Sequence, residues 1–458
     1  MTQWVSANQI RANFSAAMSE MYQNEVPLYG DLVNLVDDVN QEALDQQPEL
    51  KTQLENTGEL PRLSQERHGA IRLGTADELS QMRRIFAVMG MQPVGYYDLV
   101  PAGVPVHSTA FRAVNAEDLN QSPFRIFTSL LRLELIENEE LRQVAEQTLA
   151  KRQIFTQGAL ALTEKFEQQG GLNQDDAQQF VDEVLETFRW HTDAPVTQEV
   201  YQNLHDQHRL IADVVAFKGP HINHLTPRTL DIDVVQVGML ARGIPPKAVV
   251  EGPPRRQCPI LLRQTSFKAL QETVKFTDQQ GSHTARFGEI EQRGVALKAK
   301  GRTLYDQLLA QARQELGGAP TESNAQQYME ILEKSFSAFP DDYQTLAIEE
   351  LAYFYYLPQK SIQQEVTRAD LPTLIKTGVV KIEPIVYEDF LPVSAAGIFQ
   401  SNLGEDGQGQ YKSVSNKDIF EKCLNAKVLD EISLYTQMEE QSITECLATL
   451  NQVVESTI

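Results

Sequence analysis

The sequence is poor in cysteine and in positive charge, and it contains no long apolar run. Its 458 residues include three cysteines, too few and too dispersed for a disulfide framework or a cysteine zinc site. Forty Lys and Arg residues stand against 63 Asp and Glu residues, which gives a formal net charge of −23. This excess of negative charge repels nucleic-acid backbones and anionic lipid, so we expect neither nucleic acid nor a membrane as a partner.

Targeting and nucleotide-binding signals are missing as well. The first residues lack a basic region followed by an apolar run, and no apolar stretch approaches the roughly 18 residues that span a bilayer. The sequence contains no glycine-rich phosphate loop and no Gly-x-Ser-x-Gly nucleophile elbow. Hydrophobic residues make up 41% of the chain, enough to build a core. Together with the few cysteines, these features predict a soluble, cytoplasmic protein.

Helical periodicity dominates two long stretches, residues 1–60 and 124–210. In the first, Ser6 is a candidate N-cap, and apolar side chains recur at four-residue spacing at Ile10, Phe14, Met18 and Tyr22. A second helical pattern follows over residues 28–44. The later stretch is rich in Gln and Glu and begins with several leucines, Leu130, Leu131, Leu133 and Leu135. We interpret it as a helical insertion that covers a core or makes an interface.

Two other stretches share an order of elements and indicate an internal duplication. Each opens with His-x-x-x-Arg, at His68 and at His224, and places a threonine just before a helix that stops at a glycine. Strand-like runs follow in both. We interpret residues 65–115 and 215–295 as two βαβββ modules about a pseudo-twofold axis, which would bring the two opening strands close together.

The expected fold is α+β, with the paired βαβββ modules forming a curved β-sheet or half-barrel that carries substantial added helices. We expect a single elaborated catalytic unit over residues 1–458. In chain order its segments are N-terminal helices (1–60), the first module (65–115), a helical insertion (124–210), the second module (215–295), and a helical region (296–458) with an active-site loop at 387–403.

The eight histidines are candidate metal ligands, and the duplication selects two of them. His221 and His224 are three residues apart and would lie on opposite faces of a strand, and His224 is the one that matches His68. In a later strand-like run, Glu289 and Glu291 share one face. Two histidines and one carboxylate form the facial triad that leaves coordination positions open on Fe(II), although the residue types alone suit Fe, Mn or Zn.

Simpler interpretations compete with a metal site. A strand histidine is more often a structural hydrogen-bonding residue, and Glu-x-Glu is usually a solvated strand edge. Three such elements at equivalent places of a duplicated scaffold favour the metal. His205 and His208, with Asp213 nearby, share a helical face, which we interpret as a solvated surface. Three further histidines have no partner that the sequence identifies: His107, His191 and His283.

At these residues the sequence resembles the 2-oxoadipate dioxygenase/decarboxylase family, also called hydroxyglutarate synthases, of the vicinal oxygen chelate superfamily. The resemblance covers nearly the whole chain. It is densest in four segments, residues 65–72 (QERHGAIR), 217–224 (FKGPHINH), 283–294 and 388–403. Four long motifs in the same order are far more specific than any three-residue pattern.

The resemblance implies a mononuclear Fe(II), the Fe(2+) cofactor, held by His68, His224 and Glu289 as catalytic residues. Glu289 also fits the last ligand of the related 4-hydroxyphenylpyruvate dioxygenase, which has a similar Phe-x-Glu-x-x-Gln-Arg context. Whether Glu291 assists Glu289 stays open at this point.

The resemblance further implies that Arg72 binds substrate and that the loop carrying Val393 and Ser394 closes over it. We assign Arg72 to the distal carboxylate from charge, because a guanidinium can hold a carboxylate through two hydrogen bonds. The implied reaction converts 2-oxoadipate and dioxygen into 2-hydroxyglutarate and CO2, in lysine breakdown. No separate cosubstrate is needed, since the oxo acid and the oxidised group belong to one molecule.

Two other functions stay open. One is a Zn, Ni or Mn lyase or isomerase on the same scaffold, which Glu291 as a second carboxylate ligand would favour. The other is a non-catalytic module that binds a small molecule. The sequence specifies neither the oligomeric state nor the stereochemistry of the product, and it does not rank 2-oxoadipate against neighbouring 2-oxo acids.

Overall fold

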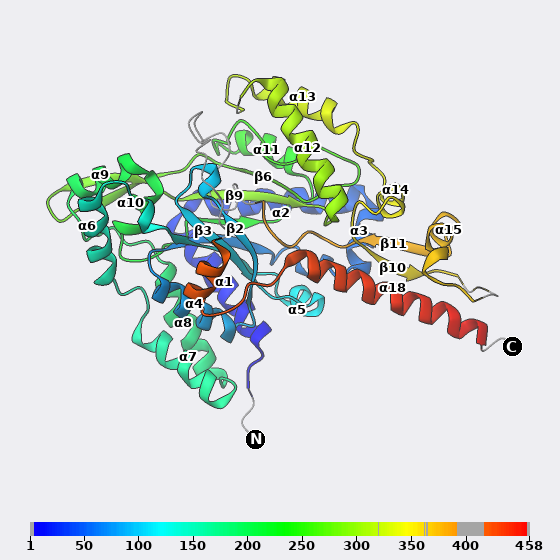
Figure 1. Cartoon of the computed structure of the whole chain (residues 1–458), viewed down its shortest axis with the longest axis horizontal. Coiled ribbons are helices and arrows are strands. Elements are labelled where there is room, and N and C mark those ends of the chain that lie inside the picture. Colours follow the sequence, from blue (N-terminus) through cyan, green and yellow to red (C-terminus); the bar gives the residue numbers. More distant parts are fainter. Residues whose placement is uncertain (1–3, 319, 361, 363–364, 392–415, 456–458) are drawn as a thin grey trace.

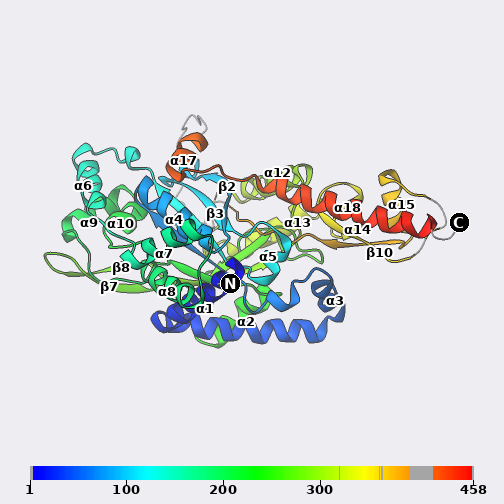
Figure 2. The same cartoon turned by 90° about the horizontal axis from the view of Figure 1, so that it is seen from below.

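The computed structural model describes residues 4–318, 320–360, 362, 365–391 and 416–455. Within these ranges the chain forms a mixed α+β structure around a curled, seven-stranded half-barrel sheet (Figure 1). Helices α1 and α2 run along one side of this sheet, and the long helix α18 extends away from it beside a second, two-stranded sheet (Figure 2). In the described ranges no helix combines the length and the apolar character that a membrane span needs.

The N-terminal helices form as their periodicity predicts. They are α1 (Ala7–Glu25), α2 (Pro27–Gln46) and α3 (Pro48–Asn56). Ser6 is the N-cap of α1, and its hydroxyl accepts a hydrogen bond from the N–H of Gln9. The four apolar residues at four-residue spacing are fully buried: Ile10, Phe14, Met18 and Tyr22. They pack against the outer face of the sheet in the largest apolar core of the protein.

The first module contains four strands and two helices: β1 (Arg67–Leu73), α4 (Ala76–Val88), β2 (Gln92–Asp98), β3 (Val106–Arg112), α5 (Ala116–Gln121) and β4 (Arg125–Leu131). Thr75 is the N-cap of α4, and Gly90, with a φ of 68°, follows the end of that helix. Strand β4 corrects the sequence analysis, which assigned residues 124–210 to helices. Its residues are buried on both faces, so the strand lacks the alternation of polar and apolar residues that identifies a half-exposed strand.

The second module follows the helical insertion, whose helices are α6 (Glu139–Ala150), α7 (Gln157–Gln169), α8 (Gln174–Leu185), α9 (Gln198–Gln207) and α10 (Arg209–Val215). The elements of the second module are β5 (His224–Pro227), α11 (Ile232–Ala241), β6 (Leu262–Ser266), β7 (Gln271–Lys275), β8 (Gln280–Thr284) and β9 (Phe287–Arg293). Strands β7 and β8 form a separate hairpin that the sequence analysis did not predict. Residues 247–250, which we predict from the sequence as a strand-like run, form no regular strand, and isolated bridges at Pro246 and Glu251 join this segment to the β6 region.

The sheet order shows the duplication directly. The strands run β2-β3-β4-β1-β5-β9-β6. The two opening strands, β1 and β5, are antiparallel neighbours at the centre. On either side, β1 pairs in parallel with β4, and β5 pairs in parallel with β9. The expected proximity of the two opening strands is therefore confirmed.

Close approach of β1 and β5 depends on a glycine. A Cβ atom at Gly69 would lie 2.9 Å from the carbonyl oxygen of His224 and 2.5 Å from the side chain of Ile222. Real Cβ atoms do not approach other atoms this closely, so only glycine fits here without displacement.

The C-terminal region is less helical than the sequence analysis predicted. Its elements are α12 (Ala299–Leu316), α13 (Ala325–Phe336), α14 (Tyr343–Ile348), β10 (Phe354–Pro358), α15 (Leu371–Lys376), β11 (Val380–Pro384), α17 (Lys417–Leu424) and α18 (Glu431–Glu455). Strands β10 and β11 form an antiparallel pair against which α18 packs (Figure 1). Val393 and Ser394 lie outside the described residues.

Candidate metal centre

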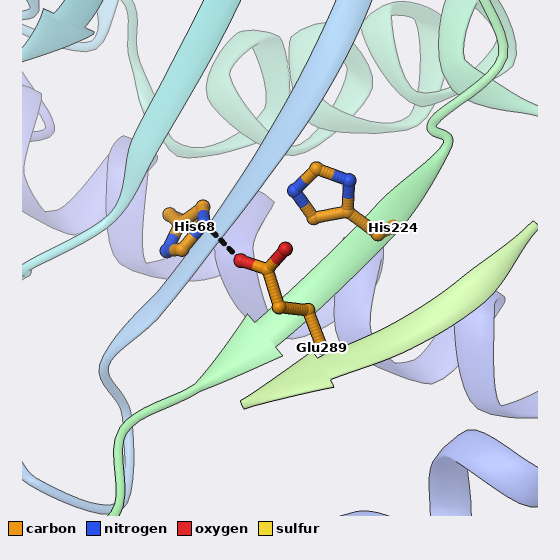
Figure 3. Close-up of side chains that lie close together, drawn as sticks. All are labelled: His68, His224 and Glu289. Atoms are coloured by element: carbon orange, nitrogen blue, oxygen red, sulfur yellow. Dashed lines mark ion pairs between the residues drawn. The ribbon is translucent and has the colours of Figure 1, made fainter. Parts of the chain in front are cut away.

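Three neighbouring strands bring His68, His224 and Glu289 together. His68 lies on β1, His224 on β5 and Glu289 on β9, and one potential ligand atom from each lies within 4.8 Å of the others. Figure 3 shows the three side chains pointing toward one another from these strands. All three are fully buried. The two histidines and the carboxylate selected from the sequence therefore form one cluster.

Alternation along the strands explains why these residues meet. Successive side chains point to opposite faces, so the residues at His68, Ala70 and Arg72 share the inner face of β1. Residues of the opposite face, such as Ile71 and Leu73, belong to the apolar core beneath the helices. The strand is buried on both sides, and polarity alone separates its inner face from its outer face.

The two modules differ at one equivalent position. In each module the histidine strand pairs in parallel with the last strand, and the register places Phe127 and Glu289 two residues beyond the direct partners of His68 and His224. The first module thus has an aromatic ring where the second has a carboxylate. The duplicated scaffold consequently supplies three potential ligands in place of four. On the side of the first module, no carboxylate takes the position equivalent to Glu289.

The buried polar atoms fit a cation. Within the described part of the chain, neither ring nitrogen of His224 has a hydrogen-bond partner, and neither does Oε2 of Glu289. A buried polar atom without a partner typically costs about 1–3 kcal/mol. Burial also raises the pKa of Glu289, because it destabilises the charged carboxylate. A divalent cation at this point would bind one ring nitrogen of His224 and a carboxylate oxygen of Glu289, and it would balance the carboxylate charge.

Neighbouring residues hold the proposed ligands in place. Oε1 of Glu289 accepts hydrogen bonds from the Gln264 amide at 2.7 Å and from the Thr226 hydroxyl at 3.2 Å, and it lies 3.2 Å from Nε2 of His68. The other ring nitrogen of His68, Nδ1, lies 3.0 Å from Oε2 of Glu291. A carboxylate on the far nitrogen of a histidine orients the ring for metal binding.

Glu291 is in turn held by Arg293. The guanidinium donates from Nε to Oε1 at 2.7 Å and from Nη2 to Oε2 at 2.9 Å. Burial alone would raise the pKa of Glu291, but Arg293 and His68 outweigh it and lower that pKa to about 2. Both oxygens of Glu291 are therefore engaged, and this geometry favours Glu291 as a support for His68 over Glu291 as a further ligand.

The two histidines experience different electrostatic surroundings. Burial, reinforced by the charges of His68 and Arg72, lowers the pKa of His224 well below its ordinary value. Burial also lowers the pKa of His68, but Glu291 and Glu289 outweigh this effect, and the pKa ends above its ordinary value. A metal ligand must be a neutral imidazole, and His224 is already in that state.

A buried network of ion pairs lies next to the site. Glu66 lies 2.8 Å from Arg125, 3.1 Å from Arg228 and 3.4 Å from Arg62, and Glu388 contacts Arg62 at 2.7 Å and also pairs with Arg125. We refer to these five residues as the Glu66–Glu388 network. It joins β4, the residue before β1 and the residue after β5 to the segment that precedes residue 392.

That segment reaches the histidines. The ring of Phe390 lies 4.9 Å from the ring of His68 and 5.4 Å from that of Phe127. Asp389 accepts two hydrogen bonds from the guanidinium of Arg112 on β3, at 2.7 and 3.0 Å. At Phe390 the chain therefore lies beside the site, a few residues before Val393 and Ser394 in the sequence.

Arg72 lies on the inner face with His68 but is held by residues that the sequence analysis did not connect to it. Its Nη1 atom donates to Asp213 at 2.6 Å and to Asn223 at 2.7 Å. Asp213 is buried, so its assignment to a solvated helix surface was wrong. His205, in contrast, is partly exposed, and its Nδ1 atom lies 3.9 Å from Oδ1 of the exposed Asp206. Both observations agree with a position at the surface.

Comparison with known proteins gives consistent matches. The chain matches the family described as 2-oxoadipate dioxygenase/decarboxylase over residues 14–402. A Pseudomonas putida protein of that name is 63% identical over 455 residues, 98% of each chain, and an Escherichia coli protein of that name is 56% identical over 451 residues, 97% of this chain and 99% of its own. A crystal structure of a hydroxyglutarate synthase from P. putida in complex with 2-oxoadipate is similar at a TM-score of 0.92 and 61% identity, covering 98% of this chain and 100% of that chain.

Proposed function

Because the chain belongs to the 2-oxoadipate dioxygenase/decarboxylase family, we propose that it binds Fe(II) through His68, His224 and Glu289 and uses this metal on its substrate. As a member of that family, the enzyme oxidatively decarboxylates and hydroxylates 2-oxoadipate to 2-hydroxyglutarate. The observation that supports the metal is the convergence of three buried ligand side chains, of which His224 and Glu289 carry polar atoms without partners in the described chain.

The reaction balances without a second substrate. One dioxygen is consumed for each 2-oxoadipate, the carboxyl group next to the keto carbon leaves as CO2, and the shortened chain retains a new carboxylate and a new hydroxyl. A bound Fe(II) would supply coordination positions for the 2-oxo acid and for dioxygen. The oxidant is thus dioxygen itself, which we propose as the second small-molecule partner.

The side chains of the protein orient the reactants and exclude water. Glu291, held by Arg293, keeps the His68 ring turned toward the site. Gln264 and Thr226 both donate to one oxygen of Glu289, which directs its other oxygen to the cluster. The ring of Phe390 lies against His68. An enclosed site of this kind protects reactive species from water.

We assign Arg72 to the distal carboxylate of the substrate. It lies on the same strand face as His68 and four residues further along β1. At the usual strand rise the two Cα atoms are about 13 Å apart. The metal would hold the oxo-acid end and the guanidinium the other end. Val393 and Ser394 are proposed as further substrate contacts, because the described chain stands beside His68 at Phe390.

Two features disfavour a lyase or isomerase with a second carboxylate ligand. Both oxygens of Glu291 are occupied by Arg293, and Phe127 takes the position equivalent to Glu289 in the first module. The location of the protein stays a prediction: its three cysteines are free, in agreement with a reducing cytoplasm, and a role in lysine catabolism is consistent with the substrate.

Oxygen uptake by metal-loaded protein tests the proposal. Apoprotein is loaded anaerobically with Fe(II), Mn(II) or Zn(II) in parallel, and 2-oxoadipate is added in aerated buffer. We expect uptake of one dioxygen per 2-hydroxyglutarate, identified by mass, with Fe(II) only. Product formation with Zn(II), or without oxygen uptake, would contradict an iron-dependent dioxygenase.

A further inference from the structure

Asp213 lies at the centre of a buried cluster that the reaction scheme above does not use. Its Oδ2 atom accepts the hydrogen bond from Arg72 at 2.6 Å, and its Oδ1 atom lies 3.0 Å from Nε2 of His283 and 3.4 Å from Nε2 of His221. Nδ1 of His283 is 2.8 Å from the hydroxyl of Tyr201. We call Asp213, His221, His283 and Tyr201 the Asp213 cluster.

The direction of the hydrogen bonds follows from the charge of Asp213. Burial alone would raise the pKa of Asp213, but Arg72 and His221 outweigh it and hold that pKa well below its ordinary value. An ionised carboxylate only accepts hydrogen bonds, so Nε2 of His283 donates to it. On the other side of the ring, Nδ1 of His283 shares a hydrogen bond with the hydroxyl of Tyr201. These hydrogen bonds end at Oδ1 of Asp213, and Oδ2 of Asp213 accepts the hydrogen bond from Arg72.

The cluster joins segments that are far apart in the sequence. Arg72 comes from β1, Asp213 from α10, His283 from β8 and Tyr201 from α9, and His221 precedes β5. Aromatic rings enclose it: Trp190 lies 4.6 Å from His221, and Phe217 lies 4.9 Å from His283. The helical insertion and the β7–β8 hairpin thus meet at the guanidinium of Arg72.

A second metal site is a poor explanation for this cluster. Oδ2 of Asp213 already binds a guanidinium, whose positive charge would oppose a cation at the same carboxylate. Among the described residues, only His68, His224 and Glu289 bring three potential ligand atoms within 4.8 Å of one another. The contacts instead suit the binding of a positively charged side chain. Nη1 of Arg72 donates one hydrogen bond to Asp213 and one to Asn223.

We propose that the Asp213 cluster is a positioning device for Arg72 that sets the distance between the metal and the guanidinium and so selects 2-oxo acids by chain length. This inference rests on the proposed function, in which the metal binds one end of the substrate and Arg72 the other. Two fixed binding points match one chain length best. Without the contacts of the Asp213 cluster, the flexible side chain of Arg72 could move its guanidinium to meet shorter and longer substrates.

The test compares steady-state kinetics of Asp213→Asn and Tyr201→Phe with those of the wild type. Asp213→Asn keeps the shape but removes the charge that holds Arg72. We expect KM for 2-oxoadipate to rise by about 10- to 100-fold, the usual effect of losing a charged hydrogen bond. The preference for 2-oxoadipate over 2-oxoglutarate and 2-oxopimelate, measured as the ratio of kcat/KM values, should fall by about fivefold or more.

Tyr201→Phe removes only the outermost hydrogen bond and changes no charge. We expect smaller shifts in the same two quantities, with iron content unchanged. The matched control is Asp233→Asn, which removes the charge of Asp233 and one of the two hydrogen bonds that it accepts from Arg263 on β6. This control should change neither KM nor the preference among chain lengths.

The outcomes separate this inference from the function on which it rests. Lower thermal stability of Asp213→Asn with wild-type KM and wild-type preference would overturn the positioning role. If Asp213→Asn does not fold, the Tyr201→Phe preference decides, and an unchanged preference again overturns it. Arg72→Met provides the reference: an unchanged KM in that variant would instead refute the assignment of Arg72 to the distal carboxylate.

Discussion

Glu289 and Glu291 have the same side chain and share one face of β9, yet their surroundings give them different roles. Arg293 occupies both oxygens of Glu291, whose Oε2 also lies 3.0 Å from His68. Oε2 of Glu289 has no hydrogen-bond partner in the described chain. An oxygen without a partner can bind a cation, whereas a fully engaged carboxylate orients the ligand beside it.

Alanine substitutions should separate these two roles. Glu289→Ala removes a ligand, so we expect loss of iron and of turnover. Glu291→Ala keeps all three ligands but releases the His68 ring, and we expect iron affinity or turnover to fall by about 10- to 100-fold. Iron content after gel filtration and initial rates of oxygen uptake measure both. A loss of iron in Glu291→Ala together with normal iron in Glu289→Ala would exchange the roles.

Individual residues could be predicted only where a pattern marked them. The repeated His-x-x-x-Arg motif selected His68 and His224, and strand alternation put Glu289 on the same side as Glu291. Nothing in the sequence linked Asp213 to Arg72, because 141 positions separate them and the contact depends on how the helical insertion packs. His283 had no identifiable partner for the same reason.

At the scale of elements, the two opening strands, β1 and β5, carry the two histidines of the site, and the spacing between these strands depends on Gly69. The order of strands and helices within each module could be predicted from the sequence, since helix caps and glycine stops are local signals. Strand β4 could not, because both of its faces are buried and its residues do not alternate between polar and apolar. The β7–β8 hairpin is mostly polar and exposed, and it lacks an apolar pattern altogether.

Gly69→Ala should disturb both the sheet and the metal site. The added Cβ would lie 2.9 Å from the carbonyl oxygen of His224, so β1 and β5 must separate. We expect a loss of about 1–3 kcal/mol in the free energy of unfolding, together with weaker iron binding. Chemical denaturation and iron titration provide the measurements.

The matched control for this change is Gly318→Ala. Gly318 is exposed, and a Cβ atom there would meet nothing within 4 Å. Its stability and iron affinity should equal those of the wild type. Equal effects of the two substitutions would show that the close approach of β1 and β5 does not hold the site.

At the scale of the whole molecule, buried charge joins the C-terminal region to the sheet. Glu388 precedes residue 392, and it pairs with Arg62 and Arg125 beside β1 and β4. Burial would raise the pKa of Glu388, but these two arginines outweigh it and lower that pKa to about 2, from an ordinary value of 4.5. The unfolded chain therefore binds more protons than the folded chain between these values, and the stability that Glu388 contributes above about pH 4.5 is lost as the pH falls toward 2.

Glu388→Gln tests this contribution. Removing one partner of a buried ion pair typically costs about 3–5 kcal/mol. We expect that loss at pH 7, and we expect the difference from the wild type to shrink as the pH falls below about 4.5. Urea unfolding at several pH values measures both. Glu167→Gln, which breaks a solvent-exposed pair with Arg84, should cost little at any pH. A difference that is independent of pH would contradict the assignment of charge to Glu388.

The net charge of −23 acts on a substrate that carries two negative charges. Surface repulsion slows the approach of such a molecule, and salt screens it. Raising the ionic strength from about 0.01 M to about 0.15 M shortens the Debye length from about 30 Å to about 8 Å, so we expect kcat/KM for 2-oxoadipate to increase. The singly charged 2-oxohexanoate is the control and should change less. A decrease for 2-oxoadipate would show that local positive charge dominates its approach.

The location of the metal is tested most directly by diffraction at the iron absorption edge. Crystals of protein loaded anaerobically with Fe(II) should give one strong anomalous peak within bonding distance of His68, His224 and Glu289. The peak should disappear in His224→Ala crystals grown in the same way. A peak at Glu291, at the Asp213 cluster or at His205 and His208, with none between the three proposed ligands, would contradict the account.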